Sequence, residues 1–219
     1  MDVEKFKDDV YVITDRLAAS LQKDDVPKLN YVRQRLIDLY QQNLVKINHS
    51  VLELICAANM ISNGYVVDVE KQLTDSLVCD VYAKKDAKVS IIEIETGFTP
   101  PEHALDTIDY YTSRIVSKVA RYSKYCAKFS LATPVIGMLP IHKIFLNPST
   151  LRPENEIKKV KSLCDRFYKN PPIAYDDIVN AKLNSVYLIN IDKNFAKEID
   201  PIVYHELTMS ILAKSEIDL

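Results

Sequence analysis

Four acidic residues occur where the surrounding sequence is strongly apolar. Glu53 is the only polar residue of the segment VLELICAA, and Asp80 lies within LVCDVY. Glu93 and Glu95 alternate with isoleucine at the end of VSIIEIE. A carboxylate in such surroundings is unfavourable unless it is paired, hydrogen-bonded or bound to a metal ion. These acids are therefore the first candidates for chemistry.

The spacing of the acids indicates a shared site. Residues two apart on a strand point to the same face, so Glu93 and Glu95 share one face. If the segments around Asp80 and Glu93 pair as a hairpin, these two side chains lie next to each other. Neighbouring carboxylates repel and raise each other's pKa, whereas a divalent cation removes the repulsion. Mg²⁺ prefers carboxylate oxygens, so the pattern is typical of a magnesium site. The alternative interpretation is an acidic stripe on the solvent face of the strand.

The order of these residues along the chain is also informative. A glutamate on a helix is followed by Gly-Tyr-Val, a strand with Asp, a hairpin, a strand with Glu-x-Glu, and a helix. This order resembles the PD-(D/E)xK nuclease superfamily, and most of all its archaeal Holliday-junction resolvases and related archaeal-virus nucleases. The resemblance covers roughly residues 45–135, about half of the chain. Its carriers are Glu53, Gly64-Tyr65-Val66, Asp80 and Glu93-Ile94-Glu95.

The resemblance implies a metal-dependent endonuclease that hydrolyses DNA phosphodiester bonds. By this resemblance Asp80 and Glu93 bind Mg²⁺ or Mn²⁺, and Glu53 supports a metal ion or its water. The ion would lower the pKa of the bound water and stabilise the pentavalent phosphate. Branched DNA is a candidate substrate, a homodimer is the implied assembly, and an archaeal or archaeal-virus origin is implied as well. The implied catalytic residues are Glu53, Asp80, Glu93 and Glu95.

The chain departs from the superfamily pattern at two positions. Cys79 precedes Asp80 where proline is usual, and Glu95 stands where lysine is usual. Glu95 then acts as a base or a second metal ligand, or Arg114 or Lys118 supplies the cation, or the site is impaired. The last possibility leaves a non-catalytic nucleic-acid-binding protein on a degenerate nuclease fold. An assembly or interaction protein with merely exposed acidic stripes is the third hypothesis.

A run of positive charge gives separate support for DNA as a partner. Between Tyr110 and Pro153 there are seven basic residues and no acid. A solvated helix face usually interleaves the two signs, whereas an unmixed face fits DNA phosphates. Helical spacing places five cations on one face of the helix expected after the strands. These expected nucleic-acid-binding residues are Arg114, Lys118, Arg121, Lys124 and Lys128.

The elements that must position these residues follow from apolar periodicity. The pattern predicts helices over 3–22, 29–61, 102–128, 154–168 and 201–214, and strands at 65–69, 77–82, 89–95 and 185–192. Two further short apolar runs lie at 130–133 and 135–139. A helix, three strands, a helix and a strand in this order predict an α/β fold. We expect a restriction-endonuclease-like central mixed β-sheet flanked by helices, with helical N-terminal and α+β C-terminal extensions.

Three regions are expected on this basis. Residues 1–28 form the N-terminal helical extension and residues 29–139 the nuclease-like core. Residues 140–219 form a C-terminal extension that packs on the core or makes a dimer interface.

Composition excludes several other functions. The 219 residues contain only three glycines, which rules out the Walker A loop, the dinucleotide fingerprint, the GxSxG elbow and the kinase glycine loop. The four cysteines match no zinc or redox spacing, so core positions are expected. His49, His103 and His142 are scattered and are expected at the surface or behind a ligand.

The expected compartment is intracellular. The N-terminal segment MDVEKFKDDV is charged and unlike a signal peptide, and no apolar run approaches the roughly 20 residues of a membrane helix. We therefore expect a cytoplasmic protein without membrane contact, or one of the host cytoplasm if it is viral.

Overall fold

The computed structural model describes residues 3–214 and shows an α/β protein. Its strands form one six-stranded mixed sheet, in the order β1-β2-β3-β4-β5-β6, flanked by helices. This confirms the predicted α/β class and the mixed sheet. The described chain divides into two compact units, one comprising residues up to Ile94 with Leu188–Lys197, and the other the remaining residues.

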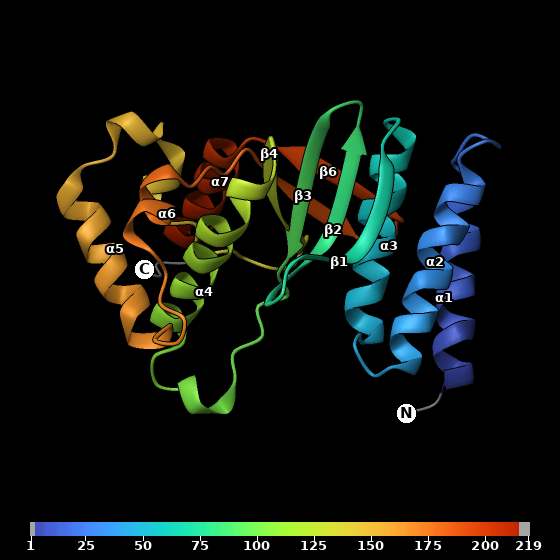
Figure 1. The fold of residues 1–219 in the computed structure, drawn as a ribbon, viewed down its shortest axis with the longest axis horizontal. Coiled ribbons are helices and arrows are strands. Elements are labelled where there is room, and N and C mark those ends of the chain that lie inside the picture. Colours follow the sequence, from blue (N-terminus) through green and yellow to red (C-terminus); the bar gives the residue numbers. More distant parts are fainter. Residues whose placement is uncertain (1–2, 215–219) are drawn as a thin grey trace. The chain divides into compact units, whose positions relative to one another are not determined.

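The first unit consists of three helices followed by a three-stranded antiparallel meander (Figure 1). Its elements are α1 (Val3–Ala18), α2 (Val26–Gln41), α3 (Ile47–Ser62), β1 (Val66–Thr74), β2 (Leu77–Lys85) and β3 (Lys88–Ile94). Apolar stripes on the helices form the core because residues three and four apart share a helix face. Phe6 and Tyr40 join α1 to α2 by stacking at 3.7 Å between ring centroids.

The predicted long helix over 29–61 is wrong, because α2 and α3 are separate helices. Asn43 adopts a left-handed φ of 59° between them, a conformation that asparagine tolerates better than most residues. The apolar period runs through the break because both helices bury a stripe of the same kind. Leu44, which continues the period, is 63% exposed.

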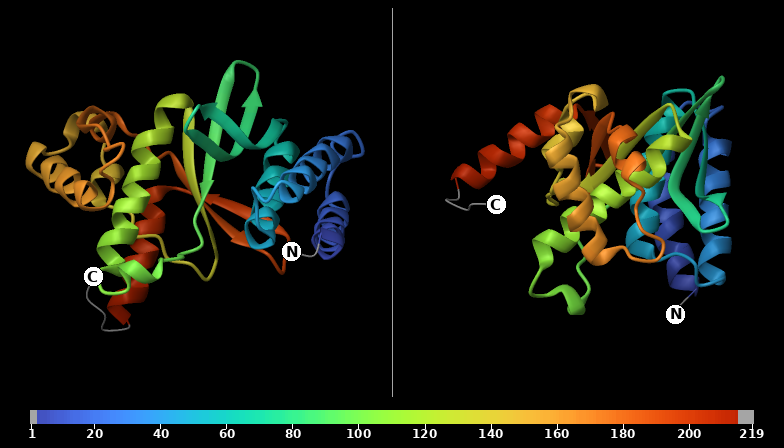
Figure 2. Two further views of the ribbon diagram at one scale, coloured as in Figure 1. Left: turned by 60° about the horizontal axis from the view of Figure 1, so that its bottom comes forward. Right: turned by 60° about the vertical axis from the view of Figure 1, so that its left-hand side comes forward.

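The second unit contains α4 (Thr107–Tyr122) and most of the C-terminal elements. These are β4 (Lys128–Pro134), α5 (Glu154–Phe167), α6 (Tyr175–Asn180) and α7 (Pro201–Lys214), with the 3-10 helices η1 (Pro101–His103), η2 (Ser123–Tyr125), η3 (Lys143–Leu146) and η4 (Ser149–Leu151). The strands β5 (Ser185–Asn190) and β6 (Phe195–Ile199) contain residues of both units. Figure 2 shows α7 as a long, regular helix that ends the described chain.

The helix predicted over 102–128 is shorter than expected. It begins at Thr107 and ends at Tyr122, and Cys126 is already extended, with φ −144° and ψ 159°. Lys124 therefore lies in η2 and Lys128 in β4, so neither belongs to the helix face on which helical spacing placed it. The run 135–139 is not a strand, and β6 was not predicted.

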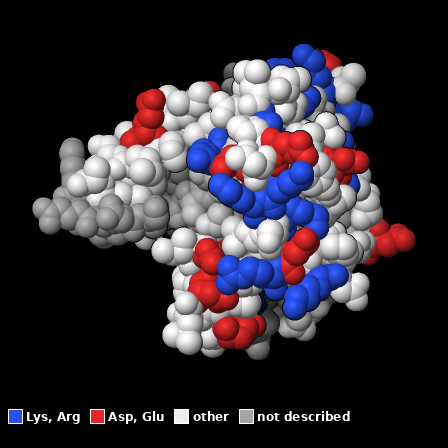
Figure 3. Space-filling view, turned by 90° about the vertical axis from the view of Figure 1, so that its left-hand side faces the viewer, with Lys and Arg blue, Asp and Glu red and all other residues white. Residues whose placement is uncertain are grey.

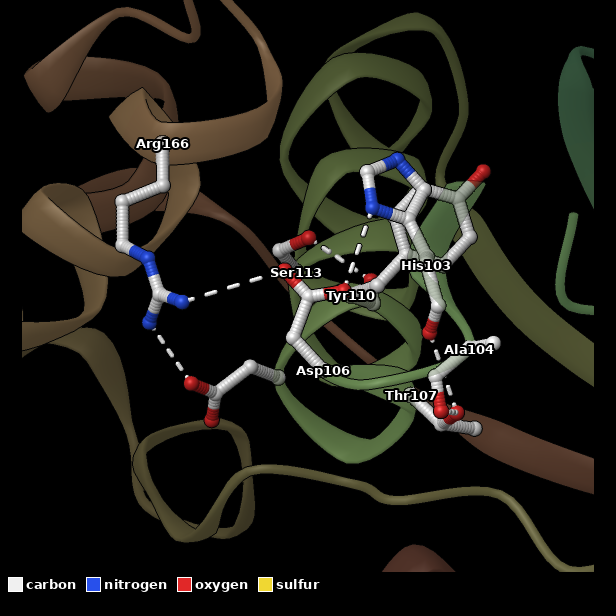
Figure 4. Close-up of polar contacts among 8 residues, drawn as sticks. His103, Ala104, Asp106, Thr107, Tyr110, Ser113 and Arg166 are labelled. Carbon is white, nitrogen blue, oxygen red and sulfur yellow. Dashed lines mark hydrogen bonds and ion pairs between the residues drawn. The ribbon is translucent and has the colours of Figure 1, made fainter. Parts of the chain in front are cut away.

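The start of α4 is fixed by a cluster of polar and aromatic contacts (Figure 4). His103 stacks on Tyr110 with ring centroids 4.1 Å apart, and its Nδ1 lies 3.2 Å from Oδ1 of Asp106. Arg166 of α5 donates to Oδ2 of Asp109 at 2.6 Å. His103 is thus engaged in holding η1 against α4.

Three of the four cysteines are core residues, as the sequence predicted. Cys56, Cys79 and Cys164 are buried, and burial raises the pKa of the Cys164 thiol to about 12. A buried thiol with a raised pKa is a packing residue rather than a nucleophile.

Candidate metal centre

The hairpin between β2 and β3 brings two of the predicted acids together. Val81 pairs with Ile92, and the same antiparallel register places Asp80 level with Glu93. The backbone N–H of Asp80 donates to Oε1 of Glu93 at 3.0 Å, and the N–H of Ile94 donates to Oδ2 of Asp80 at 2.5 Å. The expectation that Asp80 lies beside Glu93 is therefore confirmed, and backbone donors fix both carboxylates.

Burial excludes an exposed acidic stripe. Glu53 is fully buried, and Glu93, Glu95 and Asp80 are between 1% and 8% exposed. Acids this deep need hydrogen bonds, ion pairs or a cation. The partners of each carboxylate therefore decide what the site can do.

Glu53 lacks such partners. It lies on α3, and neither of its side-chain oxygens has a hydrogen-bond partner within residues 3–214. Burial raises the pKa of Glu53 well above its ordinary value, and the charges of Asp80 and Glu70, together with a side-chain interaction with Glu70, raise it further. A carboxyl group in this position either holds a proton or requires a cation beside it.

His49 lies one helical turn before Glu53, so the two side chains share a face of α3. Its Nε2 is buried and has no hydrogen-bond partner among the described residues, and it lies 3.6 Å from Oδ2 of Asp80. The sequence did not single out His49, although its spacing of four from Glu53 is the signal that would have found it. The sequence placed His49 at the surface or behind a ligand, and in the structure its side chain is 32% exposed beside Asp80.

Glu70 is the second residue that the sequence reasoning missed. The pairs Val69–Val81 and Lys71–Cys79 flank it, so it lies level with Asp80 across the β1–β2 hairpin. The strand predicted at 65–69 ended one residue too early to include it. Glu70 also has a left-handed φ of 47°, which a residue other than glycine rarely adopts within a strand.

Together these side chains form one cluster in the first unit. Each residue contributes one ligand atom, and the four atoms all lie within 4.8 Å of one another. Carboxylate oxygens with an imidazole nitrogen form a donor set that suits divalent metal ions. The unpartnered oxygens of buried Glu53 fit a cation as well. The cluster consists of His49, Glu53, Glu70 and Asp80.

Glu95 has different surroundings from the other acids. It is the first residue of the second unit, and its backbone N–H donates to the carbonyl of Ala132 at 2.8 Å. Nε of Arg114 lies 3.0 Å from both of its carboxylate oxygens, and Nζ of Lys118 lies 2.9 Å from Oε1. Burial disfavours the charge of Arg114, but Glu95 outweighs this and raises the pKa of the guanidinium. Glu95 is thus a buried anion neutralised by two cations.

The expected basic face is also paired within the second unit. Arg121 donates to the carbonyl of Pro171 at 2.8 Å, Lys124 pairs with Asp177 at 2.8 Å, and Lys128 pairs with Glu198 at 2.5 Å. Figure 3 shows acidic and basic side chains interleaved over the face that carries α5. Residues 110–153 contain no acid, but acids from other elements of the same unit pair with cations of this stretch. The five cations do not form the unmixed row that their order in the chain indicates.

No helix within residues 3–214 combines the length and apolar character that a bilayer span requires. Comparison of the chain with protein-family models, with curated proteins and with solved structures gives no match.

Proposed function

We propose that this protein is a metal-dependent endonuclease of the PD-(D/E)xK type that hydrolyses DNA phosphodiester bonds. The observation that carries the proposal is buried Glu53, whose unpartnered carboxylate lies beside Asp80. Such a group is costly in an apolar core unless a cation offsets it. The resemblance in residue order adds the reaction class, and branched DNA is the substrate class that it favours.

Asp80, Glu93 and Glu53 are the residues that would hold Mg²⁺ or Mn²⁺. A bound ion supplies a water of lowered pKa and stabilises charge on the phosphate. The backbone N–H groups of Asp80 and Ile94 orient the two strand carboxylates, so their positions do not depend on flexible side chains. Glu53 adds a carboxylate from α3 on the buried side of the hairpin.

Glu95 has a different role in this proposal from the lysine that it replaces. Because Arg114 and Lys118 both contact its carboxylate, Glu95 is not a free base. We propose that it positions these two cations for contact with DNA phosphate. Arg114 is 33% exposed and Lys118 is 16% exposed, so Arg114 is the more accessible of the two.

The proposed DNA contacts of Lys124 and Lys128 require an exchange of partners. Their side chains are 47% and 34% exposed, and exposed ion pairs contribute only about 0–1 kcal/mol. A phosphate can therefore replace Asp177 or Glu198 at low cost. Arg121 contacts a carbonyl and the ring of Tyr168 rather than an acid, so its charge is not neutralised by these contacts.

A non-catalytic DNA-binding protein on the same fold is the second candidate function. The observation in its favour is that Glu95 is ion-paired with both Arg114 and Lys118 and is therefore not free to act as a base. The two candidates share a DNA surface and differ only in hydrolysis.

A cleavage assay on four-way junctions, linear duplex and single strands in Mg²⁺ or Mn²⁺ separates the two candidates. Asp80→Asn should abolish cleavage, and Asp15→Asn, an exposed acid of α1, serves as the matched control. Cleavage by the Asp80 variant at the wild-type rate rejects the proposed site. DNA binding without cleavage by the wild type supports the second candidate.

We propose a second copy of this chain as a further partner, docked on α7. Five large apolar residues of α7 are each about half exposed, and Ile108 and Met138 extend the surface around a cavity of about 210 Å³. At roughly 60–120 Å² of apolar surface for a fully exposed side chain, these seven expose on the order of 200–400 Å². A standard interface buries roughly 800 Å² per partner, somewhat more than half of it apolar, so these residues can supply a large part of the apolar area of a homodimer interface. The five α7 residues are Ile202, Val203, Leu207, Met209 and Ile211.

A further inference from the structure

We infer that His49 and Glu70 are metal ligands, and that with Glu53 and Asp80 they form a site selective for a divalent transition metal such as Mn²⁺ over Mg²⁺. The inference deepens the proposed function, on which it rests for the identity of the metal-bound residues. Neither His49 nor Glu70 belongs to the residue pattern from which that function was proposed.

Glu53 is the observation that distinguishes this cluster from an ordinary group of acids. Its side chain is completely buried, and both oxygens lack a hydrogen-bond partner within the described chain. One of those oxygens lies within 4.8 Å of a ligand atom from each of His49, Glu70 and Asp80. A buried carboxylate without a geometric hydrogen-bond partner, directed into a cluster of donor atoms, fits a cation bound between them.

The spacing of the donor atoms matches a single ion. Opposite ligands of an octahedral Mg²⁺ lie about 4.2 Å apart, and those of the larger Ca²⁺ about 4.6–5.2 Å. No two of the four ligand atoms lie more than 4.8 Å apart, so their separations do not exceed the span of one coordination shell. The four atoms are therefore close enough together to be ligands of one ion.

His49 determines which metal fits. Its Nε2 is buried without a hydrogen-bond partner among residues 3–214 and lies 3.6 Å from Oδ2 of Asp80, so its lone pair can be directed at the same point as the carboxylate. Imidazole suits transition metals, whereas Mg²⁺ prefers oxygen ligands and keeps its waters. One nitrogen among three carboxylates therefore shifts preference away from Mg²⁺.

The backbone around Glu70 is held in an unusual conformation that places this acid in the cluster. Its φ of 47° is costly for a residue with a Cβ and persists only where neighbouring groups impose it. Arg35 of α2 supplies that constraint, because its Nε donates to the carbonyl of Val69 at 3.0 Å and its Nη2 donates to that of Glu70 at 3.4 Å. Arg35 thus holds the edge strand by its backbone while the carboxylate of Glu70 belongs to the cluster.

The test is direct binding of Mn²⁺ to the full-length, metal-free protein, measured by calorimetry and by electron paramagnetic resonance. His49→Gln and Glu70→Gln should each weaken Mn²⁺ binding at least about tenfold, since even a residue behind a ligand contributes this much. His142→Asn and Glu102→Gln, which lie outside the cluster in the second unit, are the controls and should bind as the wild type does. Competition with Mg²⁺ should show that His49→Gln lowers the preference for Mn²⁺.

Electron spin echo spectroscopy of the wild type provides a readout that needs no variant. The Mn²⁺-loaded protein should show coupling to an imidazole nitrogen, which changes when histidine is labelled with ¹⁵N. Absence of nitrogen coupling in the wild type overturns the inference, as does wild-type Mn²⁺ affinity in both variants.

Failure of the proposed function has a different signature. If the protein shows nitrogen coupling but cleaves no DNA, the proposed metal ligands are supported and only the proposed nuclease function is rejected. If DNA cleavage depends on Asp80 but the protein shows no nitrogen coupling, the proposed nuclease function is supported and His49 is rejected as a metal ligand.

Discussion

Glu95 accepts hydrogen bonds from Nε of Arg114 with both of its carboxylate oxygens, each at 3.0 Å. The Glu95 side chain is 2% exposed and the Arg114 side chain 33% exposed, so the pair is partly withdrawn from water. Lys118 adds a second cation, whose Nζ lies 2.9 Å from Oε1 of Glu95. This part of the chain therefore has one buried anion between two positive groups.

Replacing Glu95 with lysine, the residue of the PD-(D/E)xK pattern at this position, should destabilise the protein. Glu95→Lys places three cations together without an anion, and a buried unpaired charge costs about 3–5 kcal/mol. Glu95→Gln should cost less because it removes one charge without adding another. Urea unfolding of both variants measures the difference, and equal stability of Glu95→Lys and the wild type would contradict the pairing.

Glu53→Gln should stabilise the protein in the presence of a chelator. Without a cation Glu53 must take up a proton to remain buried beside Asp80 and Glu70, a cost that neutral glutamine does not have, and the glutamine amide can donate to their carboxylates. A hydrogen bond to a charged group contributes about 1.5–3 kcal/mol, of which burial of the amide offsets a part. Unfolding in EDTA should therefore show a gain, and saturating Mn²⁺ should reverse the order. A loss of stability in EDTA argues against an unpaired carboxylate.

Stability should fall below neutral pH through His142. Burial lowers the pKa of His142, and its Nδ1 accepts a hydrogen bond from the N–H of Ile144 at 3.3 Å. The folded state favours the neutral ring, so this contribution is present above the ordinary pKa of about 6.5. It is lost as pH falls toward the folded pKa, at up to about 1.4 kcal/mol per pH unit.

His142→Asn keeps an acceptor for Ile144 and removes the titration. Unfolding free energies between pH 7.5 and 5 should decline less steeply in this variant than in the wild type or in His205→Gln. If the unfolding free energies of His142→Asn and the wild type decline in parallel with pH, a group other than His142 causes the loss of stability.

Neutralising Lys124 and Lys128 should reduce the salt dependence of DNA binding. Each lost phosphate contact lowers the slope of log K against log salt by about 0.9, so the double glutamine variant should lose up to about 1.8. Lys158 and Lys159 on α5 are exposed and paired with acids of their own helix, which makes their double variant the control. An unchanged slope in the Lys124 and Lys128 variant places the DNA surface elsewhere.

Leu207→Glu should convert a dimer to a monomer. Leu207 is 51% exposed on α7, and a charge there would be buried without a partner in the proposed interface. Sedimentation equilibrium of the wild type and the variant measures the change. Val12→Glu, equally exposed on α1, should remain dimeric. A monomeric wild type removes the second copy as a partner.

Local sequence patterns predicted the strands around Asp80 and Glu93 because these strands and the turn between them are specified by residues close together in the chain. Alternation in β2 and β3 and the polar link between them specify a hairpin, and the hairpin places the two carboxylates at the same level. The break at Asn43 and the end of α4 at Tyr122 were missed, because apolar spacing continues across a turn and does not record where helical hydrogen bonds stop.

By itself, then, the sequence determined the α/β class, the hairpin and the acids at its centre. Only the tertiary structure decided the partners of each charge. Register across β1 and β2, with the left-handed backbone at Glu70, brings that residue to Asp80, and packing of α3 adds His49 and Glu53. In the second unit, acids distant in the chain pair with the cations of the α4 region. Electrostatic interactions depend on distance in space, and sequence separation sets that distance only within a single element.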